Sequence, residues 1–99
     1  MAIPFGTSIP FIEMLGCELQ EFGGGRSLIT LAPRPEHLNA FAVVHGGVIM
    51  TLHDVTMAAA ARSATDGMGA ITIEMKTSFM RPAKAPLRAE GRLIHRTKS

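Results

Sequence analysis

The amino-acid sequence predicts a small α+β domain in which an antiparallel sheet wraps around one long helix. Three observations favour this fold class. Residues 46–61 carry apolar side chains at helical spacing and end in four consecutive alanines. Residues 70–80 and 87–96 alternate apolar and polar side chains, as half-buried strands do. A three-glycine turn joins two further strand-like segments that precede the helix.

Length and composition are those of one small globular domain, here residues 1–99, with 46% hydrophobic and 18% charged residues. The single cysteine, Cys17, cannot form an internal disulfide, so nothing indicates secretion. The first residues lack the basic start and apolar run of a signal peptide, and no apolar stretch approaches the roughly 18 residues of a membrane span. We therefore expect a cytoplasmic protein.

Prolines and glycines indicate where the elements before the long helix begin, turn and end. Pro10 favours a short helix over residues 11–15, because proline is tolerated in a first helical turn. Residues 15–22 and 27–32 are predicted strands, joined through Gly23, Gly24 and Gly25 in a hairpin. Pro33 and Pro35 end the second strand.

The second half of the sequence predicts a loop, a helix and two strands. The loop covers residues 36–45, and the helix begins at Gly46 or Gly47 and ends at residues 65–67. Strands follow over residues 70–80 and 87–96. The last strand has neither a terminator nor a partner for its outer edge, so the sequence looks shortened or its edge is covered by another chain. We expect a homodimer or a dimer of dimers.

Positive charge is concentrated at the end of the chain. Residues 81–99 hold six basic side chains and one acid, whereas the preceding residues carry net negative charge. This asymmetry favours an anionic ligand, although an ordinary solvated strand face rich in arginine would also produce it.

One group of residues can carry chemistry: Asn39, His45, Gly46, Gly47 and Asp54. Glycines at a helix start let a ligand approach free backbone N–H groups, which can stabilise an oxygen that gains negative charge. Asp54 follows about two turns later among apolar side chains, where a poorly solvated carboxylate is a better base or nucleophile. The alternative is an aspartate that faces solvent on an amphipathic helix.

The segment over residues 39–54 resembles the signature of hotdog-fold thioesterases of the phenylacetate-pathway type. In that family an asparagine precedes a His-Gly-Gly turn by six positions and an acid follows the histidine by nine, and both spacings hold here. Residues 71–83 also resemble the family's second strand and its Arg-Pro-Ala exit. The likeness runs from about residue 10 to the end of the sequence.

The resemblance implies a role for each matching residue. Asp54 would activate water or attack the thioester carbonyl, the Gly46 N–H would polarise the carbonyl oxygen, and Thr72 would position the water. Asn39 and His45 would line the thioester. The substrate contacts implied are Gly47, Arg81, Pro82, Ala83, Arg96 and Lys98. Family members build each site from two subunits, and the resemblance implies acyl-CoA as the substrate. No metal or organic cofactor is expected, because oxyanion stabilisation and a carboxylate base suffice for hydrolysis.

The chain departs from the family pattern at two places. Ala42 stands where many members have glycine, which stiffens the loop without removing a reactive group. The family sheet also continues for two more strands, so the C-terminal strands and part of the CoA contact are expected to be missing.

Several residues also have simpler interpretations. His53 neighbours Asp54 but points about 100° away on a helix, so it is expected to be a packed or surface histidine. Thr72 can be an ordinary strand threonine, and Cys17 a small buried hydrophobe.

Three other functions compete with acyl-CoA hydrolysis. A non-catalytic acyl-CoA sensor would need no carboxylate, so Asp54 counts against it. A hydratase places its histidine and acid in another motif. A metal phosphohydrolase suggested by His53 and Asp54 needs further ligands on an all-helical frame, and is rejected. The pocket residues favour an aromatic or medium-chain acyl group.

Overall fold

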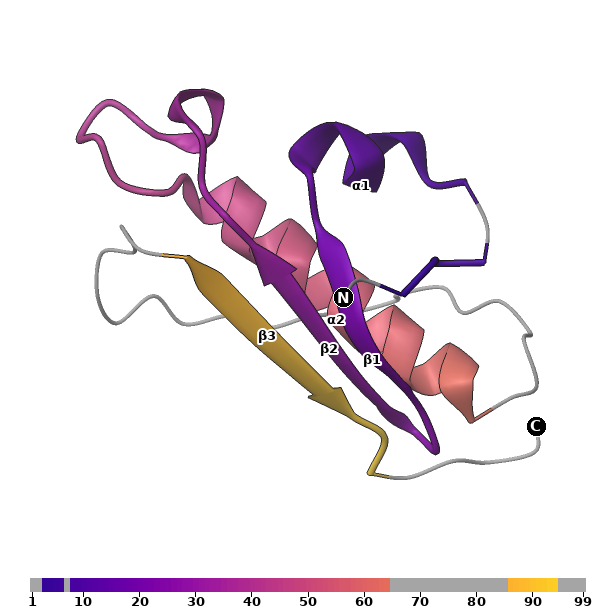
Figure 1. Cartoon of the computed structure of the whole chain (residues 1–99). Helices are drawn as coiled ribbons and strands as arrows, with labels where there is room; N and C mark the ends of the chain where they lie inside the picture. The colour runs from indigo at the N-terminus through magenta and orange to yellow at the C-terminus, as the bar shows by residue number, and fades with distance from the viewer. Residues whose placement is uncertain (1–2, 7, 65–85, 95–99) are drawn as a thin grey trace.

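The computed structural model describes residues 3–6, 8–64 and 86–94. Its elements, in chain order, are α1 (Pro10–Leu15), β1 (Glu18–Gly23), β2 (Arg26–Leu31), the 3-10 helix η1 (Pro35–His37), α2 (Gly46–Ser63) and β3 (Leu87–Arg92). The three strands form an antiparallel sheet in the order β1-β2-β3, and α2 packs against one face of it (Figure 1). The predicted α+β architecture is confirmed.

The first helix ends where a strand was expected to begin. The short helix is confirmed as α1, but β1 starts at Glu18 rather than at residue 15. Leu15 belongs to the last turn of α1, and Gly16 ends the helix in the left-handed conformation with φ of 82°. The Gly16 N–H donates to the carbonyl oxygens of Ile12 and Glu13, both at 3.1 Å. This cap occupies the residues that an earlier strand would need.

The three-glycine segment forms the predicted hairpin. Gly24 and Gly25 make the turn with φ of 58° and 81°, the paired positive angles that suit the right-handed twist of the flanking strands. The returning strand, predicted over residues 27–32, is β2 and lies one residue earlier at each end. A bulge at Gln20 interrupts the pairing of β1 with β2.

The core lies between the sheet and α2. The largest fully buried side chains of the strands are Leu19, Ile29 and Leu31. From α2, Leu52 and the small residue Ala59 belong to the same core cluster, and the next residue, Ala60, is also buried. Alanines let the helix lie close to the sheet, so the alanine-rich sequence serves close packing.

Gly91 of β3 lies very close to the backbone of α2. A methyl group built on Gly91 would lie 2.6 Å from the carbonyl oxygen of Thr56 and 2.8 Å from Ser27 Oγ. Ser27 Oγ in turn donates a buried hydrogen bond of 2.6 Å to the same Thr56 oxygen. Glycine is therefore the residue that this approach of helix and strand accepts.

Gly91→Ala is expected to lower the free energy of unfolding by about 1–3 kcal/mol, because the added methyl must displace helix backbone. Denaturation in urea measures the change. Glu90→Ala, on the exposed face of the same strand, is the control and is expected to change it by less than about 0.5 kcal/mol. Equal stabilities of the two variants would contradict the packing described.

Cys17 is buried in the core, as the sequence predicts. Burial raises the pKa of the Cys17 thiol above its ordinary value of 9.0, because the thiolate is poorly solvated there. The thiol is expected to react slowly with a thiol reagent at pH 8 and rapidly once the chain is unfolded. The raised pKa also stabilises the fold below pH 9.0, and this contribution is lost as the pH rises toward the folded-state value. Labelling rates with and without denaturant, and unfolding midpoints from pH 8 to 10, check both points.

The sheet face away from α2 is polar. A groove of about 570 Å³ crosses it, lined by side chains of all three strands, and Arg88 pairs there with Glu90 at 3.0 Å. Leu28 lies on this face beside Glu90 of β3, and it is only 9% exposed. No helix in the described part of the chain is long and apolar enough to cross a membrane.

The end of the last predicted strand differs from expectation. β3 stops at Arg92 instead of continuing to residue 96, and Ile94 is 89% exposed, so it has no packing that would favour a strand. The long helix, predicted to end at residues 65–67, ends at Ser63 with Ala64 as its C-cap. Residues 65–67 themselves, the strand predicted over residues 70–80 and residues 95–99 lie outside the described residues.

Candidate active site

The loop between η1 and α2 is closed by backbone hydrogen bonds. The His45 N–H donates to the carbonyl oxygen of His37 at 2.8 Å, and the Asn39 N–H donates to that of Val43 at 2.8 Å. An isolated antiparallel bridge joins residues 38 and 44 between these two bonds. The segment that carries the predicted site residues therefore has a defined shape, although it contains neither helix nor regular strand.

The Asn39 side chain holds the loop from within. Its Oδ1 accepts from the Phe41 N–H at 2.8 Å and from the Val43 N–H at 3.4 Å. Since both partners are donors, the atom they face must be the oxygen, and the amide nitrogen is left to donate elsewhere. No acceptor for that nitrogen occurs among the described residues. Phe41, beside it at the loop tip, is 84% exposed.

Ala42 adopts the backbone conformation that glycine prefers. Its φ is 59°, the left-handed region, in which a Cβ atom is crowded by the following carbonyl. Glycine therefore fits position 42 better than alanine does, and glycine is the residue that many members of the family it resembles have there.

Ala42→Gly is expected to raise the free energy of unfolding by about 1 kcal/mol, since glycine relieves the strain at positive φ. The matched control is Ala40→Gly in the same loop, where φ is not positive and glycine only adds freedom to the unfolded chain. Thermal unfolding of both variants gives the comparison. A loss of stability in Ala42→Gly as large as that in Ala40→Gly would argue against the strain.

His45 is the N-cap of α2. Its Nδ1 accepts from the Gly47 N–H at 2.9 Å, which leaves Nε2 as the protonated, donating nitrogen of the neutral ring. The N–H of Gly47, which was predicted to contact the substrate, is therefore engaged in the N-cap hydrogen bond to His45. Among the described residues none accepts from the Gly46 N–H. The Asn39 amide, the His45 ring and the Gly46 N–H are three donors in one short stretch of chain.

Asp54 lies farther along the same helix and is half-buried. It lies eight positions after Gly46, which corresponds to about 12 Å along the helix axis. Met50 and Met57, one turn before and after it, are 39% and 42% exposed. His53 is exposed, as expected for a surface histidine. Within one chain, Asp54 therefore does not reach the donors at the helix start.

The remaining predicted site residues lie outside the described residues: Thr72, Arg81, Pro82, Ala83, Arg96 and Lys98. Their roles stay predictions. In the ranges that the structure describes, no three side chains of histidine, cysteine, aspartate or glutamate gather as metal ligands would.

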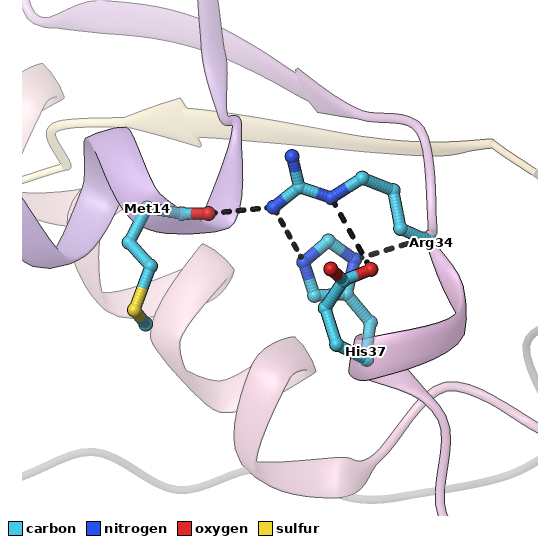
Figure 2. Close-up of polar contacts among 4 residues, drawn as sticks. Met14, Arg34 and His37 are labelled. Atoms are coloured by element: carbon cyan, nitrogen blue, oxygen red, sulfur yellow. Dashed lines mark hydrogen bonds and ion pairs between the residues drawn. The ribbon is translucent and has the colours of Figure 1, made fainter.

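Two residues beneath the loop were missed from the sequence. Arg34 and His37 contact each other, and the Arg34 guanidinium binds the end of α1, as Figure 2 shows. His37 is 2% exposed, so it belongs to the interior although its residue type is mostly found nearer the surface. In the sequence, the position of His37 two residues before Asn39 could have indicated a role near the site.

Comparison with known proteins places the chain in a family. Residues 41–99 match the thioesterase superfamily. A presumed esterase of Saccharolobus solfataricus is 33% identical over 73 residues, covering 73% of this chain and 52% of that protein. A presumed esterase of Archaeoglobus fulgidus is 35% identical over 71 residues, covering 72% and 45%. The chain spans about half the length of these curated relatives.

Solved structures agree with this placement. A conserved protein of Pseudomonas aeruginosa superposes with a TM-score of 0.88 at 26% identity, covering 92% of this chain and 74% of that one. The PaaI protein from the phenylacetic acid degradation operon of E. coli gives 0.82 at 27% identity, covering 89% and 64%. The chain thus has the hotdog fold and belongs to the thioesterase superfamily.

Proposed function

We propose that the protein hydrolyses an acyl-CoA thioester, so that water and the thioester become a carboxylic acid and the free CoA thiol. The observation that carries the proposal is the Gly46 N–H, which opens α2 without an acceptor among the described residues. A thioester carbonyl placed there would gain negative charge on its oxygen as water attacks. One such donor lowers the barrier by about 3–4 kcal/mol in enzymes that use it.

Asp54 supplies the carboxylate in this proposal, and it comes from a second copy of the chain. The distance of about 12 Å along α2 prevents Gly46 and Asp54 of one chain from meeting at one carbonyl. The exposed Met50 and Met57 on either side of Asp54 support an apposed partner, because apolar side chains on a helix gain stability when covered. Two copies related by a two-fold axis would form two such sites.

The proposed reaction then has a simple course. Asp54 takes a proton from water as the water oxygen bonds to the carbonyl carbon, and the Gly46 N–H stabilises the oxyanion. Collapse of this tetrahedral intermediate breaks the carbon–sulfur bond, and the His45 and Asn39 donors stabilise the departing thiolate. Direct attack by the Asp54 oxygen, followed by hydrolysis of the mixed anhydride, is the alternative course. Neither course requires a metal or an organic cofactor.

The acyl group is proposed to be aromatic or of medium chain length. One similar structure is named for the phenylacetic acid degradation operon, which favours an aromatic acid. The exposed Phe41 beside Asn39 offers an apolar surface to such a group.

A screen of thiol release tests the function. Phenylacetyl-CoA, hexanoyl-CoA and acetyl-CoA are incubated with the protein, and we expect the first two to be hydrolysed faster than the third. Binding of these compounds measured by calorimetry, without any thiol release, would instead make the protein an acyl-CoA sensor. Absence of both binding and hydrolysis would contradict the proposal altogether.

A further inference from the structure

Beneath the candidate site, His37 joins two parts of the chain through two different groups. Its ring Nδ1 accepts from the Arg34 N–H at 3.0 Å, and its backbone carbonyl accepts from the His45 N–H at 2.8 Å. The ring is almost fully buried, at 2% exposure. The Arg34 N–H is partly buried in this bond, so the ring nitrogen supplies an acceptor where access of water is reduced.

Arg34 extends the connection to the first helix. Its Nη2 donates to the carbonyl oxygen of Met14 at 2.6 Å and lies 3.4 Å from His37 Nε2 (Figure 2). Met14 is in the last turn of α1, which has no basic residue of its own. A guanidinium is well placed there because the carbonyl end of a helix attracts positive charge.

A continuous path therefore runs from α1 to the candidate site. It passes from the Met14 carbonyl through Arg34 and His37 to the N–H of His45, the residue that caps α2. The loop with Asn39 lies between the last two of these residues. Fixing residue 37 on one side of the loop and residue 45 on the other fixes the direction of the three donors.

We propose that Arg34 and His37 are positioning residues for thioester hydrolysis, acting through His45 and the loop instead of touching the substrate. This inference rests on the proposed function. The Arg34–His37 pair sets the place of the oxyanion donor and its neighbours before the substrate arrives. Displacement of such groups by about 1 Å is enough to lower turnover by about 10²-fold.

The test compares two substitutions of similar size. In His37→Asn the side-chain oxygen reaches the place of Nδ1 and can accept from the Arg34 N–H. In His37→Leu the volume is kept and the acceptor is lost. We expect His37→Leu to lower kcat by about 10- to 100-fold with KM changed by less than about threefold, and His37→Asn to recover kcat to within about fivefold of the wild type.

Two control variants separate positioning from stability. Ile29→Val removes a methylene group from the fully buried centre of β2. Glu36→Gln removes only the exposed ion pair between Glu36 and Arg34, in which Glu36 Oε1 lies 3.6 Å from Arg34 Nε. Both are expected to keep kcat within about twofold. An equal fall of kcat in Ile29→Val, or equal kcat in the asparagine and leucine variants, overturns the proposal. If the leucine variant does not fold, Arg34→Met replaces it, because methionine keeps much of the side-chain length but cannot donate to the Met14 carbonyl. Unchanged kcat in that variant overturns the proposal as well.

Amide hydrogen exchange gives a readout that needs no activity. In His37→Leu the Arg34 and His45 amides are expected to exchange at least about tenfold faster than in the wild type, while the core amide of Ile29 is unchanged. Unchanged exchange at His45 shows that His37 does not fix the loop and overturns the inference. If the wild type hydrolyses no thioester, the proposed function fails by itself, and the exchange result then decides separately whether His37 holds the loop.

Discussion

Asp54→Asn is expected to lower kcat for thioester hydrolysis by about 10²- to 10⁴-fold, the range lost when a general base is removed. Asparagine keeps the shape and most of the hydrogen bonding of aspartate but can neither accept the proton of water nor form an anhydride. KM is expected to change little, because the carboxylate acts mainly in the transition state. Continuous measurement of thiol release from phenylacetyl-CoA gives both constants.

The neighbouring residue provides the control for this substitution. His53→Asn alters an exposed side chain on another face of α2 and is expected to keep kcat within about twofold. More than a tenth of wild-type kcat in Asp54→Asn would show that this carboxylate is neither base nor nucleophile. A single turnover in ¹⁸O-labelled water bears on the two courses: label in Asp54 requires an anhydride that water opens at the aspartyl carbon, whereas base catalysis places the label in the product acid.

Two inactive variants are expected to restore each other when they are mixed. Asp54→Ala removes the carboxylate from both sites of the proposed dimer. His45→Ser removes the imidazole but leaves a hydroxyl that caps the Gly47 N–H, so α2 keeps its start. In a mixed dimer, one site takes its loop from the first variant and its carboxylate from the second, and is intact. Random mixing makes half of the dimers mixed, so roughly a quarter of all sites should recover.

The experiment refolds both variants together in equal amounts and compares thiol release with each variant alone. Mass spectrometry under native conditions establishes that mixed dimers are present. Activity near a quarter of the wild-type value supports a site shared between two copies. Mixed dimers without recovered activity would show that His45 and Asp54 do not act in the same site across the interface.

Much of the fold could be predicted because its signals are local. The spacing of apolar residues and the alanine run determine α2, and its predicted start at Gly46 is confirmed. Successive glycines define the first hairpin, because only such residues readily take positive φ at two adjacent positions. The start of β1 was wrong since Leu15 fits the apolar pattern of a strand as well as that of the short helix before it.

The loop that holds the candidate site was harder to predict. The spacing of Asn39 and His45 drew attention to them, but their side-chain bonds to nearby backbone follow from loop conformation, which has no periodic pattern. Arg34 binds a carbonyl 20 residues earlier in the sequence. A contact of this kind depends on where two irregular segments meet in three dimensions, so neither propensity nor patterning indicates it.

The strand order of the sheet has a consequence for synthesis on the ribosome. β2 meets β1 across a two-residue turn, but its other partner begins 56 residues after β2 ends, at Leu87 opposite Leu31. At about 5–20 residues per second, several seconds pass between the completion of β2 and that of β3. The nascent chain can fold its hairpin onto α2 in this interval, while one edge of β2 offers unpaired backbone groups to any neighbouring strand. Slow translation after Ser63 would lengthen that exposure, and a chaperone that binds extended chains would find its target there.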